Sequence, residues 1–319
     1  MSDAKSNLEK YKYNLSVQKG VRVRDEMYNV YRAYFSSMYD LYKYLKSNPE
    51  INTNVFGTDL ASVTGEESFA GKPYSKAVED LIAPYNERYG SFLSLQKDLA
   101  NADLGIVDKY IKEYNMEGDG EIDYERLVTQ DPNFYVSRKR TYEPNYITLY
   151  VQLAYIWSTG ANQVWNRAVS ISNIVTALEK AGYNVSVEAF AMSKEEDEIA
   201  CVTLNLKNGD SSLDMVGFYK ALCNVEFFRR LVFRVRETLP VTCDWSDGYG
   251  QTCSAEMVRD YFKLSEDDLF FDQPARMGVT GSDLYNDFKN IVHMLGIEEN
   301  FDMQKAEKEF DVLVRKRVI

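Results

Sequence analysis

Residues able to do catalytic chemistry are few in this chain. His293 is its only histidine, and it falls in the apolar period of a helix expected near the C-terminus. A Ser-His-Asp or Cys-His mechanism would depend on this one residue, which has no candidate nucleophile nearby in sequence. The cysteines Cys201, Cys223, Cys243 and Cys253 include no CxxC pair, and no Walker loop, GxGxxG, HExxH or paired-cysteine zinc pattern is present. We therefore assign no catalytic residue and expect reduced thiols.

Residues 115–126 have the length and glycine placement of a calcium-binding loop of the EF-hand kind. Gly120 stands at the sixth position and Asp123 at the ninth. The twelfth position requires a bidentate carboxylate but is Arg126, and the first is Asn115 instead of aspartate. Because a bound cation would face a guanidinium group, we interpret this stretch as a tight turn leading into a β-prone or helical segment.

The rest of the chain is organised around a strand, a helix and a second strand within residues 146–192. The apolar run 146–156 is continuous, which is typical of a central strand covered on both faces. After a turn, apolar residues recur at helical spacing until Gly182, the residue type expected just past a helix end. Residues 183–190 then alternate as a second strand, parallel to the first. The strand expected at 199–206 follows so short a connection that it should pair antiparallel.

This order of elements resembles that of von Willebrand factor A domains, whose first strand ends in a DxSxS loop that binds Mg²⁺. The matching stretch, residues 155–160, has no carboxylate and offers only the hydroxyl groups of Ser158 and Thr159 in place of the motif's serines. The resemblance places a second metal loop at 210–212 and a third near Asp244 or Asp247, so it implies a degenerate Mg²⁺ site. The alternative for 210–212 is that Asp210, Ser211 or Ser212 caps the next helix. The candidate metal ligands are Ser158, Thr159, Asp210, Ser212 and Asp247.

Two basic clusters are candidates for binding phosphates or an acidic partner. The formal net charge of −12, with a pI of about 4.8, disfavours nucleic acid as the main partner, because phosphate binding requires clustered lysine and arginine. Pairing with the chain's own carboxylates is the alternative. Residues 227–235 continue in helical register, although 231–235 also fit a strand. The clusters are Arg138, Lys139 and Arg140, and Arg229, Arg230, Arg234 and Arg236.

The chain divides into four parts. In the second part we expect a strand and then a helix before residue 46, a long loop at 49–74, a short helix near 77–82, and a helical hairpin or one bent helix over 92–114. The four parts are a flexible N-terminal arm (1–25), an α+β region (26–140), a von Willebrand A-like α/β core (141–300) and a charged C-terminal helix (301–319).

Six segments, in their order and spacing, carry a second resemblance. They are residues 38–45, 62–71, 120–127, 167–169 leading to 177–183, 228–234 and 247–250. Together they resemble an uncharacterised family found in bacteriophages and prophages, over roughly residues 30–250. The resemblance implies a phage-encoded protein and assigns no activity.

The expected fold class is α/β: a von Willebrand A-like, Rossmann-type sheet with flanking helices, preceded by an α+β region. The first functional expectation is a non-enzymatic phage binding or assembly protein that acts through protein–protein contacts, using its 24 tyrosines and the loops at the carboxyl ends of the strands. The alternatives are a divalent-metal-dependent binder or enzyme, and an RNA- or DNA-binding protein. We expect no cofactor, with Mg²⁺ as the alternative. No run approaches the ~18 apolar residues of a membrane span, so we expect a location in the host cytoplasm or the virion.

Overall fold

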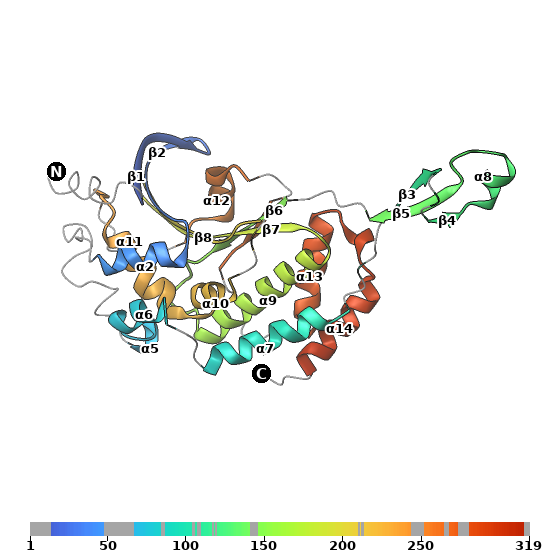
Figure 1. Cartoon of the computed structure of the whole chain (residues 1–319). Helices are drawn as coiled ribbons and strands as arrows, with labels where there is room; N and C mark the ends of the chain where they lie inside the picture. Colours follow the sequence, from blue (N-terminus) through green and yellow to red (C-terminus); the bar gives the residue numbers. More distant parts are fainter. Residues whose placement is uncertain are drawn as a thin grey trace.

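Six strands form one mixed sheet in the order β1-β2-β8-β7-β6-β9, with helices around it (Figure 1). The computed structural model describes residues 14–47, 67–83, 87–103, 106, 110–116, 118, 120–140, 146–209, 211, 214–243, 252–264, 268–273 and 281–315. The fold is therefore mixed α/β, as the sequence predicts. The strands of this sheet are β1 (Leu15–Val23), β2 (Glu26–Phe35), β6 (Tyr146–Gln152), β7 (Asn184–Glu195), β8 (Glu198–Lys207) and β9 (Leu269–Phe271).

The central crossover is confirmed. Strand β6 pairs parallel to β7, and helix α9 (Ala161–Lys180) connects them. Gly182 follows the helix with a φ of 90°, the left-handed conformation that glycine adopts readily after a helix end. Strand β8 then pairs antiparallel to β7 through a short turn. Most residues of β7 and β8 are buried, although both sequences alternate apolar with polar residues, because helices cover both faces of this part of the sheet.

Helices cover both faces of the sheet. Figure 1 shows α7, α9, α10, α13 and α14 on one side and α12 on the other. Met257 and Val258 of α12 pack in a second hydrophobic cluster with Phe190, Met192 and Ile199 of the sheet. The remaining helices are α2 (Met38–Lys46), α5 (Glu67–Ala70), α6 (Tyr74–Asp80), α7 (Glu87–Asn101), α10 (Met215–Cys223), the π-helix η1 (Phe227–Val232), α11 (Phe233–Glu237), α12 (Ala255–Phe262), α13 (Gly281–Met294), the 3-10 helix η2 (Glu298–Asn300) and α14 (Met303–Arg315).

The N-terminal strands correct the expected domain division. Residues 15–23 lie in the segment expected to be a flexible arm, but they form β1, which pairs antiparallel to β2. Its polar composition is that of an edge strand whose two ends, Leu15 and Val23, are buried. Strand β2 pairs parallel to β8, so the segments assigned to the 26–140 region and to the core share one sheet. Residues 1–13 and most of the expected loop at 49–74 lie outside the described residues.

A second, three-stranded sheet projects away from the first (Figure 1). Its order is β3-β5-β4, with β3 (Tyr110–Asn115), β4 (Glu121–Ile122) and β5 (Tyr135–Arg140). The expected helix over 92–114 is therefore correct for α7 and wrong for residues 110–115. The aromatic and β-branched content of that stretch favours a strand, and pairing with β5 decides between the two periods.

The loop resembling a calcium site is a turn into a short helix, α8 (Tyr124–Val128). The Asp123 carboxylate accepts hydrogen bonds from the backbone N–H groups of Glu125 at 3.1 Å and Arg126 at 3.3 Å, so it caps that helix. The Arg126 guanidinium pairs with Asp131 at 3.0 Å. This agrees with the interpretation as a tight turn. Across the described ranges, no helix combines the length and apolar character that spanning a bilayer requires.

Candidate functional site

The loop after β6, residues 156–160, leaves the sheet at a topological switch point. Strand β6 lies between β7 and β9, and all three strands run parallel. The chain passes from β6 to β7 through α9. Loops that follow neighbouring strands on either side of such a point diverge and leave a place for ligands. The backbone N–H of Ile156 donates to the Gln273 side chain just after β9, at 3.3 Å. We call residues 156–160 the Trp157 loop.

A buried arginine holds the backbone of the Trp157 loop. The Nη2 group of Arg229, from η1, donates to the carbonyl oxygens of Ile156 at 3.3 Å, Trp157 at 3.1 Å and Thr159 at 2.9 Å. Its Nη1 group donates to the carbonyl oxygen of Phe69 at 2.6 Å. Arg229 is only 4% exposed, and burial lowers its pKa from the ordinary value. One guanidinium group thus joins η1, α5 and the loop after β6.

The loop presents apolar side chains to solvent. Trp157 is 80% exposed and Ile156 is 47% exposed, while Phe69, whose ring packs 4.0 Å from the Arg229 guanidinium, is 38% exposed. Tryptophan is among the residues most often found at the energetic centre of protein interfaces. A fixed backbone that carries an exposed indole is therefore an arrangement suited to binding another macromolecule.

The residues expected to form a metal site are only partly described. Ser158 is exposed, and Thr159 is buried with its carbonyl bonded to Arg229. Asp210, Ser212, Asp244 and Asp247 lie outside the described residues. The Arg229 guanidinium, bonded to the carbonyl oxygens of Ile156, Trp157 and Thr159, puts a positive charge beside this loop, which disfavours a second cation close to it by charge repulsion.

The expected helix cap near residue 210 is wrong. Helix α10 begins later, at Met215, and its N-cap is Asp214. The Asp214 carboxylate accepts from the N–H groups of Val216 at 3.1 Å and Gly217 at 3.0 Å. Ser211 instead donates its hydroxyl to the carbonyl oxygen of Asn208 at 2.9 Å, which is a turn interaction.

The arginine cluster considered as a candidate for binding phosphates or an acidic partner is buried. Arg229, Arg230, Arg234 and Arg236 lie on η1 and α11, so residues 227–237 are helical. Arg230 donates to the carbonyl oxygens of Lys72 at 3.1 Å and Gly71 at 3.5 Å, and Arg234 lies 3.9 Å from Glu237. The sequence shows the charge of these four arginines but not the residues that pack around them. Because their side chains are enclosed, they cannot reach a nucleic-acid backbone. The side chains of Arg138, Lys139 and Arg140 lie outside the described part.

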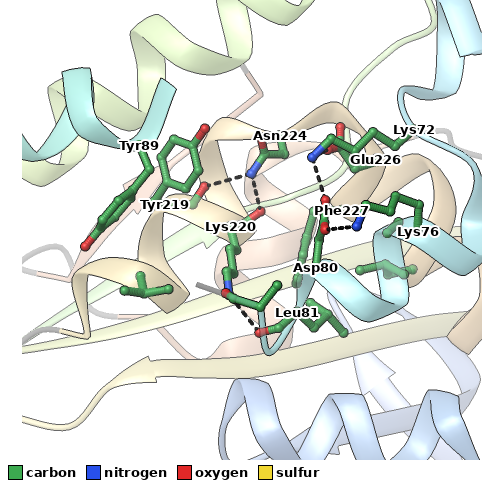
Figure 2. A pocket seen from close by; sticks show the side chains of 14 residues that line it. Lys72, Lys76, Asp80, Leu81, Tyr89, Tyr219, Lys220, Asn224, Glu226 and Phe227 are labelled. Atoms are coloured by element: carbon green, nitrogen blue, oxygen red, sulfur yellow. Dashed lines mark hydrogen bonds and ion pairs between the residues drawn. The ribbon is translucent and has the colours of Figure 1, made fainter. Parts of the chain in front are cut away.

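A cavity of about 390 Å³ opens between α6, α10 and η1 (Figure 2). Three lysines, two carboxylates and three aromatic rings face it, and no sequence motif signals it. Its members come from two distant segments, and the i, i+4 pair of Lys76 and Asp80 on α6 is the one local signal. The lining residues that matter below are Lys72, Lys76, Asp80, Tyr219, Lys220 and Phe227.

Cys243 lies beside the β7–β8 turn with two exposed carboxylates. Its Sγ is 3.6 Å from Glu196 Oε2 and 3.8 Å from Asp197 Oδ1, and the potential ligand atoms of the three residues all lie within 4.8 Å of one another. Burial and the charge of Glu198 raise the pKa of the Cys243 thiol to about 12. The thiolate, which is the nucleophile and metal ligand of cysteine, is therefore scarce at neutral pH.

We expect Cys243 to resist alkylation. Because its thiol stays protonated, iodoacetamide at neutral pH should leave Cys243 unmodified in the folded protein and modify it rapidly after denaturation in urea. Peptide mass spectrometry measures both. Rapid modification of the native protein at Cys243 would contradict the protonated state.

The four cysteines are free in the structure, in line with the expected reduced thiols.

His293 lies on the exposed side of α13, although its place in the apolar period suggested burial. Ile291 and Val292 face the core, and the side chain of His293 is 81% exposed. Its Nδ1 is hydrogen-bonded to Glu298. Nothing in this pairing resembles a nucleophile and base, since the partner is a surface carboxylate.

Comparison with known proteins adds a family. A family model described as "Domain of unknown function (DUF7192)" matches residues 10–299. No curated protein and no solved structure matches the chain.

Proposed function

The chain belongs to the DUF7192 family, and from this premise we propose that it is a non-enzymatic binding or assembly protein that acts through protein–protein contacts. A phage origin, and a location in the host cytoplasm or the virion, are part of the proposal and come from the sequence resemblance. The observation that carries it is the Trp157 loop, in which an indole 80% exposed stands on a backbone fixed by a buried guanidinium.

The physical support for this proposal is rigidity. Binding costs free energy when flexible loops and side chains must be ordered, so a loop held in advance loses less. Three carbonyl oxygens of residues 156, 157 and 159 are already bonded to one buried side chain. A partner that covers Trp157 therefore gains the burial of a large aromatic surface without first ordering the backbone.

We propose a von Willebrand A-like, Rossmann-type core over residues 141–300. The support is the order β8-β7-β6-β9, with a helical crossover between β6 and β7 and β8 antiparallel to its neighbour β7. In such a core the loops after β6 and β9 would form the binding edge, which is where the Trp157 loop lies.

The two alternative functions receive less support. A degenerate Mg²⁺ site at Ser158 and Thr159 would lie next to the Arg229 guanidinium. An RNA- or DNA-binding role would need accessible arginines, and the cluster on η1 and α11 is buried. A protein partner, or a second copy of the chain, fits the exposed indole better.

Site-specific photo-crosslinking tests the proposal. We expect p-benzoylphenylalanine at position 157, in protein expressed in its host cell, to give one dominant crosslinked product. The same residue at position 146 is the matched control, because Tyr146 is also an exposed aromatic side chain and begins the same strand, at its opposite end. Mass spectrometry then identifies the product as a partner or as a second copy of the chain.

The two positions separate the outcomes. A product specific to position 157 supports the Trp157 loop as the contact surface. Identical products from positions 157 and 146, or none from position 157 under conditions in which the protein is folded and expressed, would contradict the proposal.

A further inference from the structure

The cavity between α6, α10 and η1 has the size and lining of a small-molecule site. Its volume of about 390 Å³ falls in the range of ~300–1,000 Å³ typical of ligand pockets. One wall is apolar: Phe227 and Leu231 of η1 are buried one helical turn apart, and Tyr219 of α10 and Tyr89 of α7 meet edge to face with ring centroids 5.2 Å apart. Flat rings of this kind pack well against a flat apolar ligand.

The charged side chains of the lining include an excess of positive charge. Lys72 and Lys76 share one carboxylate, with Nζ atoms 2.5 Å and 3.2 Å from Asp80 (Figure 2). Burial alone would raise the pKa of Asp80, but the hydrogen bonds from the two lysines lower it below the ordinary value, so Asp80 is ionised at neutral pH. The second carboxylate, Glu226, lies 3.9 Å from Lys72.

Lys220 of α10 contributes the third positive charge of the cavity. Its ammonium group donates to the carbonyl oxygens of Leu81 at 3.1 Å and Ala83 at 2.6 Å. Those are its hydrogen-bond partners among the described residues, and an ammonium group has three donors. Among the residues that line the cavity, three lysines against two carboxylates leave an excess of positive charge in a chain of net charge −12, while Glu79, outside the lining, lies 3.9 Å from Lys76. Such a local reversal of sign concentrates anions.

The cavity wall is also built by buried contacts. Arg230, 1% exposed, donates its Nε–H to the carbonyl oxygen of Lys72 at 3.1 Å and so fixes the backbone from which that lysine extends. Its helix η1 is a π-helix, a conformation that occurs often at functional sites. At Gly71, whose φ is 74°, an added Cβ would lie 2.6 Å from Glu226 Oε2, so glycine permits the close approach of this segment to η1.

From this arrangement we propose that the cavity binds a small organic anion, with one carboxylate or phosphate group at the lysines and a flat apolar body against Tyr219 and Phe227. The side chains of Lys72 and Lys76 are 39% and 57% exposed, so their ammonium groups are free to turn from Asp80 toward the anionic group. The remaining donor of Lys220 completes its coordination. Charge and aromatic surface together define the ligand class, since either feature alone occurs widely on protein surfaces.

Four probes test whether the ligand needs both a negative charge and an aromatic ring. Phenyl phosphate and benzoate carry both a charge and a ring, benzyl alcohol carries only the ring, and inorganic phosphate carries only the charge. In calorimetric titrations at millimolar concentration, we expect at least one of the first two to bind about tenfold more tightly than either partial probe, consistent with a charged hydrogen bond at a partly exposed site. No binding by phenyl phosphate or benzoate, or equal binding by benzyl alcohol, would overturn the proposal.

Variants locate the binding. Lys76→Gln should weaken binding of the organic anion about tenfold, whereas Lys46→Gln, an exposed lysine on α2, should leave it unchanged. Val216→Trp fills the cavity from α10 without removing a lysine and should abolish binding. Equal affinity in the wild type and in a folded Lys76→Gln variant, verified by its melting temperature, would also overturn the proposal. Trp157→Ala should retain the affinity, which separates this site from the Trp157 loop.

Discussion

Replacing Arg229 with methionine will lower the free energy of unfolding by about 3–4 kcal/mol, because the change leaves four carbonyl oxygens without their charged donor. Methionine still fills space beside the rings of Phe69 and Tyr155 but supplies neither the hydrogen bonds nor the cation–π contacts of the guanidinium. Urea denaturation followed by circular dichroism measures the change. Limited proteolysis should also cut the Trp157 loop faster, because its backbone is released from η1.

An exposed arginine gives the matched control. Arg22 on β1 has a side chain 70% exposed and an ion pair with Asp25 at 3.5 Å. Surface pairs of this kind contribute about 0–1 kcal/mol, so Arg22→Met should leave the unfolding free energy nearly unchanged. A loss at Arg229 as small as that at Arg22 would show that the loop carbonyls are equally well satisfied by water.

Replacing Glu198 with alanine will cost about 3 kcal/mol at neutral pH, because its buried carboxylate is the common acceptor of several donors. The backbone N–H and the hydroxyl of Thr242 lie 2.9 Å and 2.6 Å from Oε1, the Cys243 N–H lies 3.0 Å from Oε2, and the Tyr31 hydroxyl lies 2.9 Å from Oε1. The change leaves these donors unpaired and detaches the segment after α11 from β8. Denaturation in urea measures the loss.

The same residue predicts a pH dependence. Burial alone would raise the pKa of Glu198, but the hydrogen bonds it accepts lower it below the ordinary 4.5. A depressed folded-state pKa means that the stabilisation is complete above 4.5 and is lost as the pH falls below that value. The stability difference between wild type and Glu198→Gln should therefore shrink below about pH 4.5. Glu307→Ala, at an exposed position on α14, should show neither effect; a constant difference for Glu198→Gln across this range would contradict the assignment.

Sequence periodicity predicts the centre of the fold because its signals are local. The β6–α9–β7–β8 unit has long apolar runs, a clear helical period and a short hairpin connection, each of which has one structural interpretation. Strand β1 carries no such signal, since its exposed lysine and glutamine residues match a loop as well as an edge strand. Strand β1 is positioned by its pairing with β2, and β2 is positioned by its pairing with β8.

The candidate sites were harder to predict because they depend on burial and distant partners. Four arginines within eight residues indicate charge, yet the groups that receive their hydrogen bonds belong to α5, to the turn before α6 and to the loop after β6. The sequence predicts that Trp157 belongs to a turn. It does not predict that the side chain is exposed or that Arg229 fixes the backbone of the turn. The lysine-lined cavity combines residues 72–83 and Tyr89 with residues 216–231, and no local spacing relates the two parts.

The parallel pairing of β2 with β8 has a consequence for how the chain is made. The pairing begins at Asn29 within β2, whose side-chain amide donates to the carboxylate of Asp197, the residue just before β8, at 3.2 Å; the two residues are 168 positions apart. At ~5–20 residues per second, the ribosome needs roughly 8–34 s to supply the second strand after the first. During that interval the β1–β2 hairpin has an unpaired inner edge, which is the kind of surface that chaperones shield and that neighbouring nascent chains can join.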